Sequence, residues 1–130
     1  EEIRRNLCMT PSEQLLQHEW ARHGTCMARR PESYFRQANR LYSAIRYPDM
    51  RNLSRQRLLT VGAFRTAFAA ANRGIDASMI AINTKPGGWL NEVRICLGRT
   101  FRPQACPPAA HGAPDTTALR IWTGAVPQRY

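Results

Sequence analysis

Four side chains that could move protons and hold an anion lie within six residues, at His18, Glu19, Arg22 and His23. If the stretch is helical, with His18 as the origin, Arg22 lies near ~40°. Glu19 and His23 follow near ~100° and ~140°, so all four groups fit on one side. A histidine titrates near neutral pH and serves as base or acid, and an arginine offers a planar fork of donors to phosphate oxygens. The spacing therefore predicts a site that transfers protons while it holds an anion.

The same residues allow two other interpretations. The first is a solvated helix face carrying an i,i+3 ion pair between Glu19 and Arg22. The second is a zinc site, which in the zinc proteases needs histidines at i and i+4. Here His18 and His23 stand at i and i+5, and the sequence has no third cluster of ligands. We therefore predict no metal and no cofactor.

The elements that must position these residues follow from local signals. Thr10 and Pro11 predict a helix start as cap and first residue, and Gly24 predicts its end or a bend. Two more helices and then strands are expected further along. The expected elements are a helix from Pro31 closed by Pro48, an irregular segment 49–57, a helix 58–72 with Thr60 as a possible cap, strands 79–84 and 89–97 around a turn at 86–88, and a last strand 119–122. We assign the aromatic stripe of the second helix to the core. This order predicts an α+β fold, with helices of the first half packed on an antiparallel sheet from the second half.

The composition indicates one basic globular domain. The chain has 130 residues and a formal net charge of +10, with 43% hydrophobic residues. That length suits a single domain, residues 1–130, with a core of its own. The excess of arginine favours a polyanionic partner such as nucleic acid, beside the plainer interpretation of a protein that is simply basic.

The four cysteines, Cys8, Cys26, Cys96 and Cys106, have no CxxC spacing. An even count without that spacing favours two disulfides and an oxidising compartment, secreted or periplasmic, over four free thiols in the cytosol. Three connectivities exist, and we choose the local pairs Cys8–Cys26 and Cys96–Cys106, which close two short loops. No apolar run is long enough for a membrane span or a signal peptide. The opening residues suggest an interior cut of a longer precursor.

Residues 18–26, His-Glu-Trp-Ala-Arg-His-Gly-Thr-Cys, resemble the second active-site segment of the T2 ribonuclease family, His-Glu-Trp-x-Lys-His-Gly-Thr-Cys. Counting the free position, eight of nine positions fit, and Arg22 replaces the usual lysine. A cysteine before the segment, a Pro-x-x-Tyr-Phe helix after it, a strand hairpin and a late cysteine pair agree with the family's layout. Only residues 18–26 are diagnostic.

The resemblance implies a T2-ribonuclease-like α+β fold and a metal-independent endoribonuclease acting on RNA. In this family the 2′-hydroxyl attacks the adjacent phosphorus, which gives a 2′,3′-cyclic phosphate and a 5′-hydroxyl. By this resemblance His23 is the general base, Glu19 and Arg22 stabilise the phosphorane, and His18 helps to bind the phosphate. Arg22 keeps the positive charge of the usual lysine but replaces a point donor with a fork.

The sequence also departs from the family. The first active-site segment, of the type Phe-x-x-His-Gly-Leu-Trp-Pro, carries the general-acid histidine and is not in this sequence. Three explanations are open: an N-terminally truncated or nicked enzyme completed by a missing segment or a second chain, a diverged member with another acid, or an inactive relative that only binds RNA. One or two strands would then be absent, which leaves a sheet edge to be covered. Besides a ribonuclease and an RNA-binding protein, a third class of function is a cationic protein that acts on membranes. No amphipathic basic helix supports this class, so we expect no membrane partner.

Overall fold

The computed structural model describes residue 2 and residues 12–124, which fall into two compact units. One unit comprises Glu1–Ile45 and Arg99–Phe101, and the other comprises Arg46–Gly98 and Arg102–Tyr130. Each is described by itself. The single domain expected from the chain length stays a prediction.

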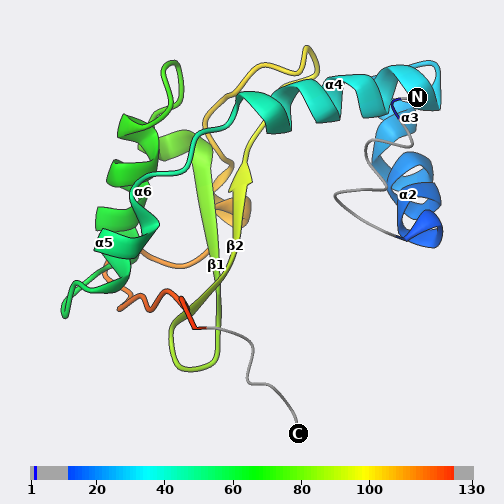
Figure 1. Ribbon diagram of the computed structural model, residues 1–130. Helices are drawn as coiled ribbons and strands as arrows, with labels where there is room; N and C mark the ends of the chain where they lie inside the picture. Colours follow the sequence, from blue (N-terminus) through cyan, green and yellow to red (C-terminus); the bar gives the residue numbers. More distant parts are fainter. Residues whose placement is uncertain (1, 3–11, 125–130) are drawn as a thin grey trace, which may run out of the picture. The chain divides into compact units, whose positions relative to one another are not determined.

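The first unit is helical (Figure 1). Its elements are α2 (Glu13–Glu19), η1 (Trp20–Gly24), α3 (Thr25–Met27) and α4 (Pro31–Ala44). The side chain of Ser12 caps α2, because its hydroxyl accepts the backbone N–H of Leu15 at 3.2 Å. The cap expected at Thr10 is therefore wrong, and Thr10 itself lies outside the described residues. The predicted start of α4 is confirmed, with Pro31 in its first turn.

The second unit holds the remaining helices and both strands. Its elements are α5 (Met50–Ser54), α6 (Val61–Ala70), η2 (Ala77–Met79), β1 (Ile80–Lys85), β2 (Trp89–Ile95) and η3 (Pro108–Ala110). Thr60 caps α6 as predicted, accepting the N–H of Ala63 at 3.1 Å. The segment expected to be irregular contains α5, which Asp49 caps through the N–H of Asn52 at 3.0 Å. That expectation is wrong because a five-residue helix is too short to show a period.

The predicted hairpin is confirmed as an antiparallel pair of β1 and β2, with a bulge between Asn83 and Thr84. The last predicted strand is wrong. Residues 118–120 form only isolated bridges, from Ala118 to Thr60 and from Arg120 to Trp89. The segment divides its hydrogen bonds between Leu59, before α6, and Gly88, in the hairpin turn. Neither pairing therefore extends over enough residues to form a β-ladder.

The outer edges of the hairpin are partly covered by this same C-terminal part of the chain. The N–H of Ala113 donates to the carbonyl of Ile82 at 2.8 Å, and that of Leu90 to the carbonyl of Arg120 at 2.8 Å. Gly112 has φ 79°, and a Cβ there would overlap the Ile82 carbonyl oxygen. Only glycine therefore lets the chain approach β1 so closely.

The core of the second unit lies between α5, α6 and β1, which Figure 1 shows side by side. Its buried apolar side chains are Leu53, Leu59, Val61, Phe64, Phe68, Ile80, Ala81, Ile82 and Leu119. Helix packing on an antiparallel pair of strands confirms the α+β class. The Cys96–Cys106 disulfide, with Cα atoms 5.3 Å apart, ties the chain after β2 to the following loop, and this predicted pairing is present.

Arg65 of α6 is buried in this core with only 1% of its surface exposed. Its Nε donates to the carbonyl of Ile80 at 2.9 Å, and its Nη2 donates to the carbonyls of His111 at 2.6 Å and Ala113 at 3.0 Å. Its Nη1 donates to the carboxylate of Asp115. One guanidinium thus fastens the 111–115 loop to β1 and α6.

Replacing Arg65 by methionine should lower the free energy of unfolding by about 3 kcal/mol, because buried carbonyls would lose their donors. Urea unfolding followed by circular dichroism measures this. Arg73→Met, at an exposed arginine of the same unit, is the matched control and should change little. Asp115→Asn should cost under about 1 kcal/mol, because that carboxylate is mostly exposed. A wild-type midpoint for Arg65→Met would contradict this account of the core.

Candidate active site

The stretch 18–26 is a continuous helix that changes pitch in its middle. The α-helical turns of α2 give way to a π turn over Trp20–Gly24, in which the N–H of Thr25 donates to the carbonyl of Trp20. α3 then continues to Met27. Of the two expectations for Gly24, an end or a bend, the end is wrong, since Gly24 has helical angles of φ −68° and ψ −37°. The bend stays a prediction. A π turn bonds over five residues and rotates less per residue than an α turn, so the expected angles do not hold beyond Glu19.

Gly24 is buried because the ring of Trp20 lies against it. A Cβ at position 24 would clash with the Cε3 atom of Trp20 and would lie 3.1 Å from the Cδ1 atom of Tyr34. Trp20 also meets the ring of Tyr34 in α4, with centroids 6.0 Å apart and planes inclined by 57°. The missing side chain of Gly24 thus makes room for the aromatic contact that joins the helix of residues 13–27 to α4.

The structure brings two of the four predicted site residues together. The Nε2 atom of His23 lies 3.8 Å from Oε2 of Glu19, and the two side chains are 61% and 39% exposed. This distance suits an ion pair when the imidazole is protonated. A carboxylate beside an exposed imidazole stabilises the imidazolium that forms when the histidine accepts a proton.

His18 and Arg22 lie on exposed surface. Within the described part of the chain, neither makes a hydrogen bond or an ion pair with another side chain. The i,i+3 pair between Glu19 and Arg22 in the plainer interpretation is therefore not formed, and Glu19 faces His23 instead. Both side chains are open to an anion from solvent. The roles of all four residues stay predictions.

Tyr34 is a neighbour of this group that sequence reasoning placed only in the core stripe. Burial raises the pKa of its phenol, and the negative charge of Glu19 raises that pKa further. The Tyr34 ring is half-buried between Trp20 and Phe35. Its place in the Pro-x-x-Tyr-Phe sequence after the motif was the signal that could have revealed this contact.

The other candidate ligands of the sequence are dispersed. Cys26 is exposed and free among the described residues, whereas Cys8 lies outside them, so the Cys8–Cys26 bridge stays a prediction. His111 belongs to the second unit, where its backbone carbonyl accepts from Arg65. No three His, Cys, Asp or Glu residues of the described ranges form a group that could hold a metal ion. No helix in those ranges is long and apolar enough to cross a membrane.

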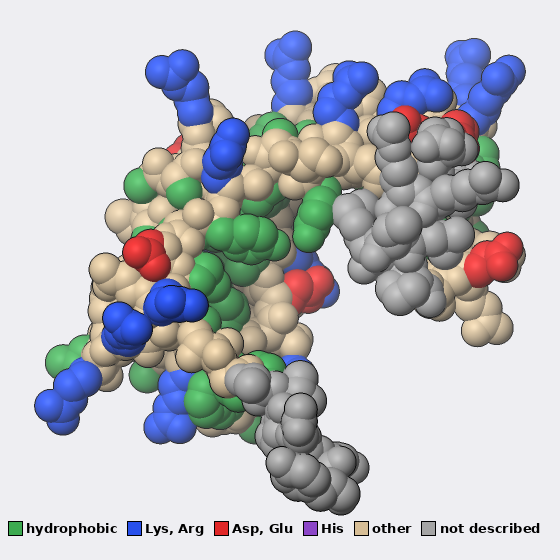
Figure 2. Space-filling model, in the orientation of Figure 1, with side chains coloured by type: hydrophobic (Ala, Val, Ile, Leu, Met, Phe, Trp, Pro, Cys, Tyr) green, Lys and Arg blue, Asp and Glu red, His purple; other side chains and the backbone are tan. Residues whose placement is uncertain are grey.

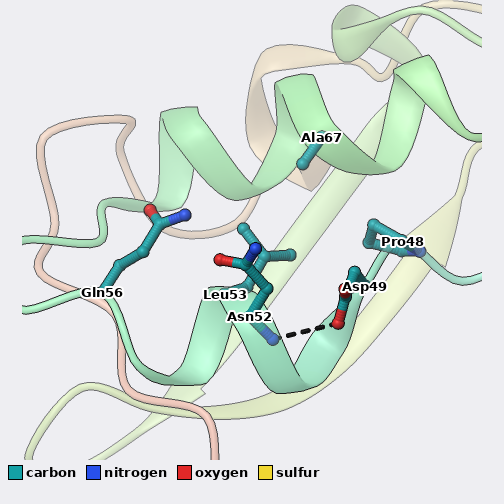
Figure 3. Close-up of a pocket in the computed structure, with 6 residues that line it drawn as sticks. All are labelled: Pro48, Asp49, Asn52, Leu53, Gln56 and Ala67. Atoms are coloured by element: carbon teal, nitrogen blue, oxygen red, sulfur yellow. Dashed lines mark hydrogen bonds between the residues drawn. The ribbon is translucent and has the colours of Figure 1, made fainter.

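A pocket of about 210 Å³ opens in the second unit between α5 and α6. It is lined by Pro48, Asp49, Asn52, Leu53, Gln56 and Ala67. Figure 3 shows Leu53 and Ala67 pointing toward each other across it, and the hydrogen bond from the Asn52 N–H to Asp49 at its side. The lining contains none of the four predicted site residues. Its only ionisable side chain, that of Asp49, caps α5.

Basic side chains spread over the surface rather than forming one run. Figure 2 shows many Lys and Arg side chains and few acidic ones on the visible face, in keeping with 19 basic and 9 acidic residues. Such a surface attracts polyanions over a wide area.

The comparisons with known proteins agree with the sequence motif. The model of the Ribonuclease T2 family matches residues 4–106. A protein of Haemophilus influenzae described as a probable ribonuclease is 38% identical over 52 residues, which are 40% of this chain and 19% of that protein. No solved structure matches the chain significantly.

Gly24→Ala should destabilise the protein by about 1–3 kcal/mol, because the added methyl group must displace the Trp20 ring. In a Trp20→Leu background the same change should cost much less, since the clash is relieved and alanine favours helix by about 1 kcal/mol. Thermal unfolding of the four proteins in this cycle measures the coupling. An equal cost in both backgrounds would show that the packing of Trp20 on Gly24 is not the cause.

Glu19→Gln should lower the pKa of Tyr34 and still leave it above the ordinary value, because burial is the larger cause. Absorbance at 295 nm against pH measures phenolate formation, and Tyr34→Phe identifies the step. Because the folded pKa is raised, the stability that this phenol contributes is present below about pH 10 and is lost as the pH rises through the folded pKa. A Tyr34 pKa unchanged by Glu19→Gln would contradict the proximity of the two groups.

Proposed function

The chain belongs to the ribonuclease T2 family, and from that premise we propose that it cleaves single-stranded RNA as a metal-independent endoribonuclease. The reaction is a transphosphorylation that leaves 2′,3′-cyclic phosphate and 5′-hydroxyl ends. The matched relative is covered over only 19% of its length, so the activity rests on the family match over residues 4–106.

The observation that carries the proposal is the pairing of His23, on the π turn, with Glu19 at the end of α2. His23 accepts the proton of the 2′-hydroxyl, and the freed oxygen attacks the adjacent phosphorus. Glu19 lies where its charge stabilises the resulting imidazolium. Because the His23 side chain is mostly exposed, an RNA strand can reach it from solvent.

Arg22 and His18 supply positive groups to the phosphate. As the 2′-oxygen adds, the phosphorane gathers negative charge, and fixed donors aimed at that charge lower the barrier most. Both side chains are exposed and have no acidic partner in the described part of the chain, so neither must break an ion pair to bind. Arg22 can present two parallel N–H groups to two phosphate oxygens.

The leaving 5′-oxygen takes its proton from a general acid outside residues 18–26. We propose that this acid belongs to a further segment of the same protein or to a second chain, as the absence of Phe-x-x-His-Gly-Leu-Trp-Pro from this sequence suggests. The same sequence feature and the net charge of +10 favour a second candidate function, RNA binding without cleavage.

We also propose that the protein works in an oxidising compartment, secreted or periplasmic. The Cys96–Cys106 disulfide supports this, because such bridges persist where thiols are not kept reduced. Cys26 would complete the pattern by pairing with Cys8.

His23→Ala should lower cleavage of a short single-stranded RNA by about 10²–10⁴-fold, because the base that accepts the 2′-proton is lost. The assay is run in EDTA, and mass spectrometry identifies the product ends. His111→Ala is the matched control, since only the backbone of that histidine makes a described hydrogen bond. Arg22→Lys should retain cleavage, whereas Arg22→Met should reduce it.

Each outcome of this assay separates two functions. Cyclic-phosphate products that vanish with His23→Ala support the ribonuclease. Full activity in His23→Ala contradicts the assigned base. RNA bound without turnover, in a salt-dependent manner, favours the second candidate function for this chain alone.

A further inference from the structure

An exposed tryptophan and two cations gather at the turn end of the β1–β2 hairpin, and a second exposed tryptophan follows two residues after one of these cations. They are Lys85, Trp89, Arg120 and Trp122, which we call the hairpin-end surface. Trp89 is 37% exposed and Trp122 is 58% exposed. Lys85 and Arg120 are exposed too. All four belong to the second unit, and none is among the predicted catalytic residues.

Backbone pairing fixes three of these residues in register. Lys85 and Trp89 are direct partners across the hairpin. Arg120 donates its N–H to the carbonyl of Gly88 at 2.7 Å and accepts the N–H of Leu90 at 2.8 Å. Figure 1 shows the chain that contains Arg120 running beside this end of the hairpin. The surface is therefore built on paired backbone rather than on a free loop.

The side chains are arranged for stacking. The guanidinium carbon of Arg120 lies 5.6 Å from the centre of the Trp89 ring, within the range of a cation–π contact. Along residues 119–122 exposure alternates, with Leu119 buried and Arg120 and Trp122 exposed. Such alternation is typical of extended chain, in which residues two apart lie on the same side. Arg120 thus lies against the Trp89 ring in space and two residues before Trp122 in the chain.

The two cations have no acidic partner. Neither Lys85 nor Arg120 forms an ion pair within the described ranges, and the acidic residue of β2, Glu92, is held by Arg94 at 2.9 Å. Aromatic side chains that stack on bases, together with cations that track the backbone, are how proteins bind single-stranded nucleic acid without reading its sequence.

We propose that the hairpin-end surface binds single-stranded RNA, with unstacked bases on Trp89 and Trp122 and phosphates at Lys85 and Arg120. This inference rests on the proposed function, because it names a second contact for the same RNA. Duplex RNA does not fit, since its bases are already stacked on one another. An anionic membrane is the other polyanion that tryptophans and cations suit, and the test includes it.

The probe is a fluorescein-labelled 2′-O-methyl hexauridylate, which has no free 2′-hydroxyl and cannot be cleaved. Anisotropy in EDTA should show that Trp89→Ala and Trp122→Ala each raise Kd about tenfold. Trp89→Phe keeps an aromatic face and should stay within about threefold of the wild type. Tyr42→Ala, at an exposed aromatic residue of α4, is the matched control and should not change Kd.

A second readout holds even where a tryptophan variant folds poorly. The plot of log K against log salt should lose about 1.4 of its slope in Lys85→Ala/Arg120→Ala, because each lost phosphate contact removes about 0.7. An unchanged slope, or an unchanged Kd in a folded Trp89→Ala/Trp122→Ala variant, overturns the proposal. If the same variants bind RNA normally and lose only their binding to phosphatidylserine vesicles, the proposal is also overturned and the surface is assigned to membranes.

Failure of this proposal is distinct from failure of the ribonuclease. The uncleavable probe reports binding only, whereas unmodified RNA with the wild type and His23→Ala reports catalysis. The tryptophan variants could bind the probe as tightly as the wild type while cleavage still depends on His23. In that case the ribonuclease proposal stands, and the hairpin-end surface is rejected as an RNA-binding site.

Discussion

A single buried guanidinium holds the second unit together. Arg65 is buried in the core, where an unpaired charge is very costly, and it is accepted there because four oxygens surround it. Those oxygens belong to β1 and to the 111–115 loop, so the charge can be buried only when that loop is in place. The loop in turn leads the chain to Arg120 and the hairpin turn. The hairpin-end surface therefore depends on a contact in the core.

The first unit is held together by aromatic packing instead of a buried charge. Its short helices are joined to α4 through the rings of Trp20 and Tyr34, and Gly24 leaves the space that this contact needs. The same turn presents His23 to Glu19 on the solvent side. Packing on one face and the approach of His23 to Glu19 on the other are thus set by a single π turn. This explains why a residue without a side chain stands inside a segment dense in functional groups.

Signals that are local in the sequence predicted the fold well. The Thr60 cap and the Gly87–Gly88 turn act within a few residues, so α6 and the hairpin were found. Two of the failures were non-local. Residues 119–122 alternate as a strand does, but their partners are two separate segments. The π turn contains Trp20, whose ring packs on Gly24 and meets Tyr34 of α4. The residue types of the site were predictable, whereas the change of pitch that sets their angular positions was not.

The π turn also has a consequence for how this stretch can change in length. A π turn is equivalent to an α-helix that has gained one residue. Deleting Ala21 would allow an ordinary α-helix to run from α2 into α3, and the direction of the chain after the deletion would change little. The spacing within the turn would change instead, because the histidine would stand three residues after Glu19 and the glycine three residues after Trp20. Substitutions such as arginine for lysine at position 22 preserve this spacing, whereas a deletion of one residue inside the turn shortens it. The two contacts of the turn are therefore tied to its count of residues as well as to its residue types.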